Sequence, residues 1–464
     1  MIEDLPARPD SIVIEDGIIV TMDPRRTVIE GGSILVERGR IAEVGSLGPI
    51  PGGHRAEFRI PAKGMAVIPG LIDAHVHLAQ SLLRGAADDL SLVDWLKKRV
   101  WPIQGSFTEE DGKLSAELSM LEMIKSGTTS FVGVDVVSRY GFDGIAKAVS
   151  KAGMRGALAK TIMDRPGYGE RGSIMPPGLV EKKDTTIREA KSMIRKYNSV
   201  KGGLVRTWVA PRSLGGCSEE LYGDVSELAR ESHSRITMHL AEVREDAEYA
   251  KQNYGTTPFE FIEKVGLAGP RSLFAHMVWL TDKDIQRVAR TKSNVAHCPS
   301  SNLKLASGIP RIPELIGAGA NVGLGCDGAP CNNSHDMIRE MKLAALIQKG
   351  RLLDPLTMPA TAVLEMATLN GARAIGMESE VGSIEVGKKA DLVLIDLRKP
   401  HLTPYRDVVS NIVYSAMGSD VDSVMVDGRF LLRGGKALTL DEESIVSEAQ
   451  KSQDGLISRS GVNA

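Results

Sequence analysis

The chain has 464 residues, of which 42% are hydrophobic and 25% are charged, as in an ordinary soluble globular protein. Lys and Arg number 57 and Asp and Glu 59, so the net charge of -2 argues against a polybasic protein that binds nucleic acid or a membrane surface. No run approaches the ~18 apolar residues of a membrane span, and the acidic N-terminus predicts no signal peptide. The four cysteines form no CxxC pair, which is typical of a reducing compartment, and we expect a cytoplasmic protein.

Both ends of the chain are rich in short strands. β-Branched residues broken by Gly or Asp occupy residues 11–16, 17–23, 32–39, 40–46 and 56–62, and the same pattern returns at 390–397 and 423–432. We therefore predict one small β-sandwich domain, residues 1–64 and 383–439, formed by both chain ends. The polar residues 440–464 predict a surface helix with a frayed tail.

Between these ends, short apolar runs alternate with helical stretches, which indicates βαβ units and a parallel sheet. Thr108 and Asp111 form a capping-box pattern before one of the helices. Eight such units predict an α/β fold, a (β/α)8 TIM-like barrel over residues 65–382. The predicted strands are residues 66–72, 129–135, 154–160, 204–210, 236–240, 272–276, 294–298 and 321–327.

Five polar residues fall at the ends of four predicted strands. His75 and His77 follow the first strand, and because residues two apart on a strand share a face, their imidazoles can bind one ion. His239, His276 and Asp327 end the fifth, sixth and eighth strands, and the C-terminal strand ends of such a barrel meet in one ring. The alternative is a set of hydrogen-bonded core histidines with an Asp turn. Together these groups suit one divalent metal ion, Zn²⁺ or Fe²⁺, with an open position for water.

Glu242 lies three residues beyond His239, where a carboxylate can take a proton from an activated water and pass it on. The alternative is an exposed Glu at the start of a helix, since REDAE follows. Cys326 precedes Asp327 and would point the other way, into the packing of the barrel. The pattern therefore favours a one-metal hydrolytic site with Glu242 as its proton carrier.

The order HxH, H, H and D, with Glu three residues after the third His, resembles the amidohydrolase superfamily, and within it the deaminase and chlorohydrolase branch. The resemblance covers nearly the whole chain, through VIPGLIDAHVH, GTTSF, AHCPSSNLKLASGIP, GCDGAPCNNS and GSIEVGKKADLVLID. It implies one metal ion per chain, held by His75, His77, His239 and Asp327. His276 would bond the attacking hydroxide or serve as a further ligand, and Glu242 would move protons.

Residues around the site separate the branches of this superfamily. Methylthioadenosine-type deaminases resemble the chain overall, but they usually have Glu where Gln104 stands and His where Arg212 stands. Guanine deaminases share the HxHxxQ pattern, which ends here in Gln80, and the Arg after the fourth strand. Arg212 could bind a ring carbonyl through its rigid fork or form a surface ion pair. Gln80 could bind the edge of an amino-heterocycle or be a loop amide. Further candidates for substrate binding are Gln104, His297, Asn302 and Cys331.

The sequence therefore predicts a metal-dependent hydrolytic deaminase of a small aminated N-heterocycle, with Glu242, His276 and Asp327 as catalytic residues. The favoured substrate is an oxopurine or pterin, such as guanine, 8-oxoguanine or isoxanthopterin. The alternatives are an adenosine-type deaminase acting on S-adenosylhomocysteine or methylthioadenosine, an s-triazine amino- or chlorohydrolase, an amide or lactam hydrolase, and a non-catalytic relative.

Two tryptophans could contact the substrate. Trp95 and Trp101 lie on an inserted segment after the first strand, where they could stack on a flat ring or pack within a helix. Homo-oligomers are common in this superfamily, so we expect one. We expect a small heterocycle as the substrate, and neither nucleic acid nor a membrane as a partner.

Overall fold

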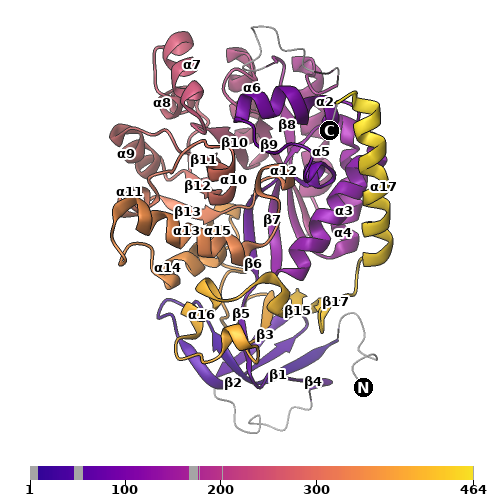
Figure 1. Ribbon diagram of the computed structural model, residues 1–464, viewed down its shortest axis with the longest axis vertical. Coiled ribbons are helices and arrows are strands. Elements are labelled where there is room, and N and C mark those ends of the chain that lie inside the picture. Colours follow the sequence, from indigo (N-terminus) through magenta and orange to yellow (C-terminus); the bar gives the residue numbers. More distant parts are fainter. Residues whose placement is uncertain (1–8, 46–55, 167–175, 177, 201, 463–464) are drawn as a thin grey trace.

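Eight parallel strands form the centre of the molecule (Figure 1). The computed structural model describes residues 9–45, 56–166, 176, 178–200 and 202–462. Each strand pairs with the next along the chain, and a bridge between Val76 and Asp327 brings the last strand against the first. The predicted barrel is therefore confirmed. Its strands are β6 (Leu71–Val76), β7 (Thr128–Val136), β8 (Arg155–Ile162), β9 (Val205–Pro211), β10 (Ile236–Leu240), β11 (Ser272–His276), β12 (Asn294–His297) and β13 (Asn321–Leu324).

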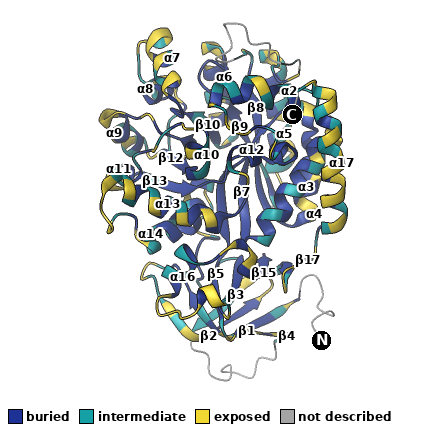
Figure 2. Ribbon diagram, in the orientation of Figure 1, coloured by how far each residue is buried: buried dark blue, intermediate teal, exposed yellow. Residues whose placement is uncertain are grey.

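The barrel strands are buried, and the exposed residues lie mainly on the surrounding helices and loops (Figure 2). Burial on both faces explains why the strands are near-continuous apolar runs. The predicted capping box is present, since Thr108 Oγ1 accepts the Asp111 N–H at 3.2 Å and the Asp111 carboxylate accepts the Thr108 N–H at 2.8 Å. The helices after the strands are α3 (Glu109–Lys125), α4 (Phe142–Ala152), α5 (Lys183–Asn198), α6 (Glu219–Ser232), α7 (Arg244–Tyr254), α8 (Pro258–Lys264), α9 (Asp282–Thr291), α10 (Pro299–Lys304), α11 (Ile312–Gly317), α12 (Ala329–Asn332), α13 (Met337–Leu352), α14 (Ala360–Glu365), η5 (Met366–Asn370) and α15 (Gly371–Ile375).

Strands from both chain ends form a second sheet of nine strands, at the bottom of Figure 1. It encloses a core of its own that includes Ile12, Ile34, Val67, Leu392 and Phe430. A bulge at Gly17 joins residues 11–20 into one strand, where the sequence predicts two. The strands are β1 (Ser11–Val20), β2 (Val28–Glu37), β3 (Arg40–Gly45), β4 (Phe58–Pro61), β5 (Met65–Pro69), β14 (Leu392–Asp396), β15 (Val421–Val426), β16 (Arg429–Arg433) and β17 (Lys436–Ala437).

The first predicted barrel strand, residues 66–72, is wrong as a single element. β5 pairs with β1 and β14 in the chain-end sheet, and only β6 belongs to the barrel. The chain passes from one sheet to the other at Gly70, where a Cβ would lie 2.2 Å from Thr129 Oγ1. Hydrophobicity is continuous across Gly70, so the apolar pattern alone does not show the break.

Helical segments cover the barrel mouth and one flank. Between β6 and β7 lie η1 (Leu78–Leu83), α1 (Leu92–Trp95), η2 (Leu96–Val100) and α2 (Trp101–Gln104). The C-terminal helix α17 (Glu442–Ser460) runs along α3 (Figure 1), where Ser452 and Arg459 bind the Asp111 carboxylate at 2.8 and 2.7 Å. The remaining helical turns are η3 (Ser138–Tyr140), η6 (Pro400–Leu402), α16 (Val408–Tyr414) and η7 (Gly418–Asp420).

Some sequence predictions lie outside the described residues, namely the absence of a signal peptide, where it concerns residues 1–8, and the last two residues of the expected tail. In the part of the chain that the structure describes, no helix has the length and apolar character needed to cross a membrane. The predicted domain boundaries and the expected oligomer stay predictions.

Candidate metal and active site

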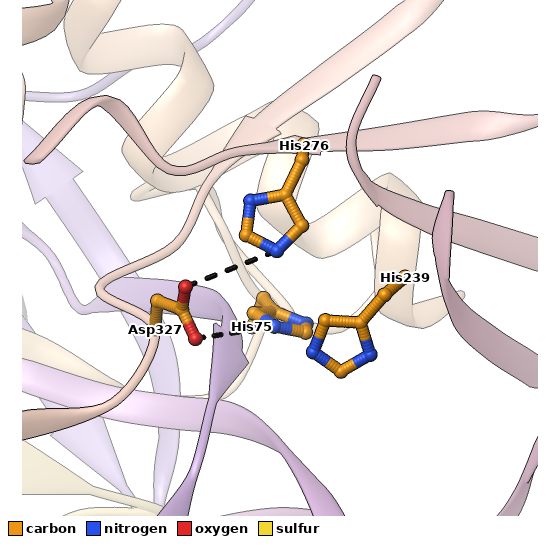
Figure 3. A group of neighbouring side chains, drawn as sticks. All are labelled: His75, His239, His276 and Asp327. Carbon is orange, nitrogen blue, oxygen red and sulfur yellow. Dashed lines mark ion pairs between the residues drawn. The ribbon is translucent and has the colours of Figure 1, made fainter. Parts of the chain in front are cut away.

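The polar residues at the strand ends converge on one point, as Figure 3 shows for four of them. His75 Nε2 and His77 Nε2 lie 3.6 and 3.1 Å from the same atom, Asp327 Oδ1. His77 Nε2 and His239 Nε2 face one another at 3.0 Å. His276 Nε2 lies 3.8 Å from the other carboxylate oxygen, Asp327 Oδ2. The structure thus brings together all five residues that the sequence places at the ends of β6, β10, β11 and β13.

The backbone is strained where the strands end at this site. Asp135, Ala241, His276 and Asp327 have φ angles of 55°, 51°, 73° and 65°. This left-handed conformation costs an L-residue roughly 1–2 kcal/mol. It persists only where the surrounding structure fixes it, and such strain clusters at functional sites. The strained turns therefore mark the same strand ends as the polar side chains do.

The side chains present fit a divalent metal ion. Both ring nitrogens of His75 and Nε2 of His276 are buried without a hydrogen-bond partner among the described residues, which is unfavourable unless another group binds them. Single atoms of His75, His239, His276 and Asp327 all lie within 4.8 Å of one another. His77 belongs to an overlapping group with Asp135 and His239. Nitrogen and carboxylate ligands in such an arrangement suit Zn²⁺, so these residues could hold it.

Electrostatics favour the protonation states that metal binding requires at His75, His239 and Asp327, but they favour the protonated ring at His77. Burial lowers the pKa of His75 to about 4 and that of His239 well below its ordinary value, which keeps both rings neutral. Burial opposes charge on Asp327, but His75 and His77 hold the pKa of its carboxyl well below the usual range. Burial likewise opposes charge on His77, yet Asp135 and Asp327 raise its pKa to about 9. A metal ion bound there would displace the His77 proton, because ligating imidazoles are neutral.

Asp135, at the end of β7, is a site residue that the sequence motifs do not reveal. Its Oδ2 lies 3.2 Å from His77 Nδ1 and 3.0 Å from Arg212 Nε. Burial works to raise the pKa of Asp135, but Arg212 and His77 lower it below the ordinary value. The Arg212 carbonyl lies 3.2 Å from His239 Nδ1 and can accept its proton. These contacts direct the Nε2 atoms of His77 and His239 towards the centre of the ring. The only sequence signal for Asp135 is its place at a strand end.

Glu242 lies beside the ring and is buried, with only 7% of its side chain exposed. Its Oε2 is 3.6 Å from His276 Nε2. Burial raises the pKa of the Glu242 carboxyl above its ordinary value, while His276 opposes the shift. A buried carboxylate with a raised pKa is suited to accept and return a proton near neutral pH. The alternative, an exposed Glu at the start of a helix, is wrong.

A cavity opens onto this ring. Three predicted substrate-binding residues are among those that line it, namely Gln80, Arg212 and Cys331. Trp95 and Trp101 also line the cavity, beside apolar side chains such as Leu92 and Leu305. Gly328 leaves room for the amide of Gln80, since a Cβ there would lie 2.0 Å from Gln80 Oε1. The cavity therefore combines an apolar wall with a small set of polar groups.

Three other predicted substrate-binding residues are not among the described residues that line the cavity. Asn302 Oδ1 lies 2.9 Å from His276 Nδ1, so it holds the ring of that histidine. His297 is fully buried at the end of β12, and Gln104 is buried at the end of α2. Position near a strand or helix end does not tell which way a side chain points, because successive residues of a strand face opposite sides.

The barrel, the chain-end sheet and the ring of His and Asp side chains are the features of hydrolases that carry a metal site at the barrel mouth. The profile of the amidohydrolase family matches residues 66–431, and the chain belongs to this family. It is a hydrolase that acts on carbon–nitrogen bonds.

The relatives cover almost the whole chain. It is 38% identical over 448 residues to the 5'-deoxyadenosine deaminase of Methanosarcina mazei, covering 97% of this chain and 99% of that protein. It is 40% identical over 440 residues to the 5-methylthioadenosine/S-adenosylhomocysteine deaminase of Moorella thermoacetica, covering 95% of this chain and 98% of that protein.

Solved structures share the fold. An adenosine deaminase from Xanthomonas campestris with bound zinc is 30% identical, with a TM-score of 0.90 over 98% of this chain and 100% of that one. An atrazine chlorohydrolase from Arthrobacter aurescens complexed with zinc has a TM-score of 0.87 over 95% of this chain and 100% of that one. Its identity is 24%, so this likeness shows the fold alone.

Proposed function

We propose that the protein is a zinc-dependent hydrolytic deaminase of adenosine-type nucleosides. The observation that carries the proposal is the likeness, at 38% and 40% identity over nearly the full chain, to deaminases of 5'-deoxyadenosine and of methylthioadenosine and S-adenosylhomocysteine. The buried Glu242 carboxylate beside the His and Asp ring supports the deamination chemistry. Trp95 and Trp101 give the cavity flat aromatic walls that suit a purine ring.

The oxopurine or pterin reading loses the two positions on which it depends. Arg212 stands 3.0 Å from the Asp135 carboxylate, so its charge is already paired and it is less available to a ring carbonyl. Gln104 is not among the described residues that line the cavity, so its difference from the Glu of nucleoside-type relatives does not weigh against a nucleoside. The two deaminase relatives, in contrast, favour the adenosine-type alternative.

His75, His77, His239 and Asp327 would hold one divalent metal ion, with His276 as a further ligand or as a partner of the attacking water. Such an ion supplies Lewis acidity, which lowers the pKa of a water molecule towards neutrality. Buried nitrogens on His75 and His276, which have no hydrogen-bond partner in the described part of the chain, support this assignment. Hydrogen bonds to the other ring nitrogen hold these imidazoles in orientation. They come from Asp135 to His77, from the Arg212 carbonyl to His239 and from Asn302 to His276.

The chain's own residues would manage the protons. Glu242 takes a proton from the attacking water as its oxygen forms a bond to the amino-bearing ring carbon, and gives that proton to the neighbouring ring nitrogen. His276, which contacts both carboxylates, and Asp327 would orient the attacking oxygen. Glu242 then takes the remaining proton from the added oxygen and gives it to the amino group, and the carbon–nitrogen bond breaks so that ammonia leaves. Water and the aminated base are thereby converted to ammonia and an oxo-base.

Zinc-loaded protein incubated with 5'-deoxyadenosine tests the proposal. We expect ammonia and the corresponding inosine product in equal amounts, with activity lost after a chelator removes the metal and restored by zinc. Guanine, isoxanthopterin and an aminated triazine are the comparison substrates. Turnover of one of these, with none of any adenosine derivative, would contradict the adenosine-type assignment.

A further inference from the structure

The turn that carries Glu242 is held in an unfavourable conformation. Ala241, between the end of β10 and Glu242, has a left-handed φ of 51°. Its carbonyl accepts N–H groups from Val278 at 2.9 Å and Trp279 at 2.8 Å, both beyond the end of β11. These bonds fix the turn up to Ala241, but they do not reach the main chain of Glu242 itself. A further contact is needed there, because a strained turn stays in place only where its surroundings fix it.

Asp246 makes that contact. Its Oδ2 accepts the backbone N–H of Glu242 at 2.7 Å and that of Val243 at 3.3 Å. Asp246 is only 2% exposed and lines the same cavity as Glu242. Its other oxygen, Oδ1, is buried and has no hydrogen-bond partner in the described residues. The Asp246 carboxylate is therefore buried in the wall of the active-site cavity. The oxygen that forms hydrogen bonds binds the main chain at Glu242, the proposed proton carrier.

We propose that Asp246 is a positioning residue for proton transfer, which fixes the Glu242 carboxylate by binding the Glu242 main chain. The inference rests on the proposed role of Glu242. Asp246 does not replace Glu242, since its Oδ2 is bound to the N–H groups of Glu242 and Val243. Its effect passes through the peptide N–H of Glu242, and a misplacement of about 1 Å at a reacting group costs about 10²-fold in rate.

A simple helix cap does not account for this arrangement. Asp284 of α9 occupies the corresponding place in its helix, 1% exposed, and its Oδ2 accepts the Thr281 N–H at 3.0 Å. Thr281 Oγ1 returns the bond by accepting the Asp284 N–H at 3.2 Å. In α7 the equivalent residue is Val243, whose aliphatic side chain can return no hydrogen bond. The shortest bond of Asp246 goes instead to Glu242, one residue before the cap.

The experiment compares Asp246→Ala, Asp246→Asn and the matched control Asp284→Ala. Asn keeps an oxygen that can accept the Glu242 N–H, whereas Ala removes it. We expect Asp246→Ala to lower kcat by about 10- to 100-fold with KM and zinc content little changed. Asp246→Asn should keep kcat within about threefold of wild type. Asp284→Ala should lower the melting temperature much as Asp246→Ala does, yet leave kcat unchanged.

Each other outcome overturns the inference. A normal kcat in Asp246→Ala shows that Glu242 needs no help from Asp246. An equal loss in Asp246→Asn shows that the charge, and not the accepted hydrogen bond, is what matters. A similar loss in Asp284→Ala shows a general effect of helix capping. If Asp246→Ala yields no soluble protein, Asp246→Ser removes the same carboxylate with a shorter polar side chain, and the same outcomes apply.

All assays use whichever substrate of the nucleoside, oxopurine and triazine panel the wild type turns over. A failure of the adenosine-type assignment then appears in the wild type's choice of substrate. A failure of the positioning role appears only in the ratio of variant to wild-type kcat.

Discussion

Replacing Glu242 with Gln should lower kcat by about 10² to 10⁴, the usual contribution of a general acid–base group. The amide matches the carboxylate in size, so the packing of a side chain that is only 7% exposed is preserved. It cannot take a proton from water, and burial leaves little solvent to take over that task. Since each factor of ten corresponds to about 1.4 kcal/mol, the expected loss of transition-state stabilisation is roughly 3–5.5 kcal/mol.

Steady-state ammonia release, with zinc measured on the same samples, checks this expectation. Zinc content should stay at the wild-type level, because Glu242 lies against His276 and not within the ring of proposed ligands. In the wild type, kcat should fall as the pH falls through the raised pKa of Glu242, because the protonated carboxyl cannot accept a proton. Gln at this position does not titrate, so the part of the acid limb that Glu242 causes should vanish in the variant. Near-normal kcat with full zinc content would refute the proposed proton path.

Three further variants test the proposed metal ligands, the side chains that orient them, and the contact between the barrel and the chain-end sheet. His239→Ala should lose most of its zinc in elemental analysis, because the ring loses a buried nitrogen ligand; full retention would contradict the ligand set. Arg212→Met should lower kcat for every substrate in steady-state assays, since Arg212 contacts His239 and Asp135; a higher KM confined to carbonyl-bearing bases would restore the oxopurine reading. Arg155→Met should lower the free energy of unfolding in denaturant by about 3–5 kcal/mol, because it breaks a buried pair with Asp391 across the two sheets; a wild-type midpoint would show that the pair adds nothing. Arg155 also pairs with Asp427, whose Oδ1 lies 2.9 Å from Arg155 Nη2. Burial opposes charge on Asp427, but Arg155 lowers its pKa, so the stability from this second pair is full above the unfolded pKa of about 3.9 and is lost as the pH falls through the lower folded value.

The sequence predicts the barrel and most of the ring because both follow from local patterns. Strands buried on both faces appear as apolar runs, and His75 and His77 share one face by the two-residue period of a strand. The break between β5 and β6 at Gly70 does not follow from a local pattern. It depends on Thr129, which is distant in sequence and packs where a side chain at residue 70 would stand.

The lining of the cavity was the least predictable part of the site. Gln80 and Cys331 line it as expected, but His297 and Asn302 lie elsewhere, because chain position does not fix the direction of a side chain. Asp135 carries no motif, and its pairing with Arg212 decides how that guanidinium can be used. The sequence around Arg212 therefore does not show that Asp135 neutralises its charge.

A comparison of kcat/KM for 5'-deoxyadenosine and guanine, on zinc-loaded wild-type protein, tests the central claim most directly. The proposed function predicts a clearly higher value for the adenosine derivative, with one ammonia released for each nucleoside converted. A higher value for guanine would contradict it, and would mean that Arg212 binds a ring carbonyl despite its contact with Asp135.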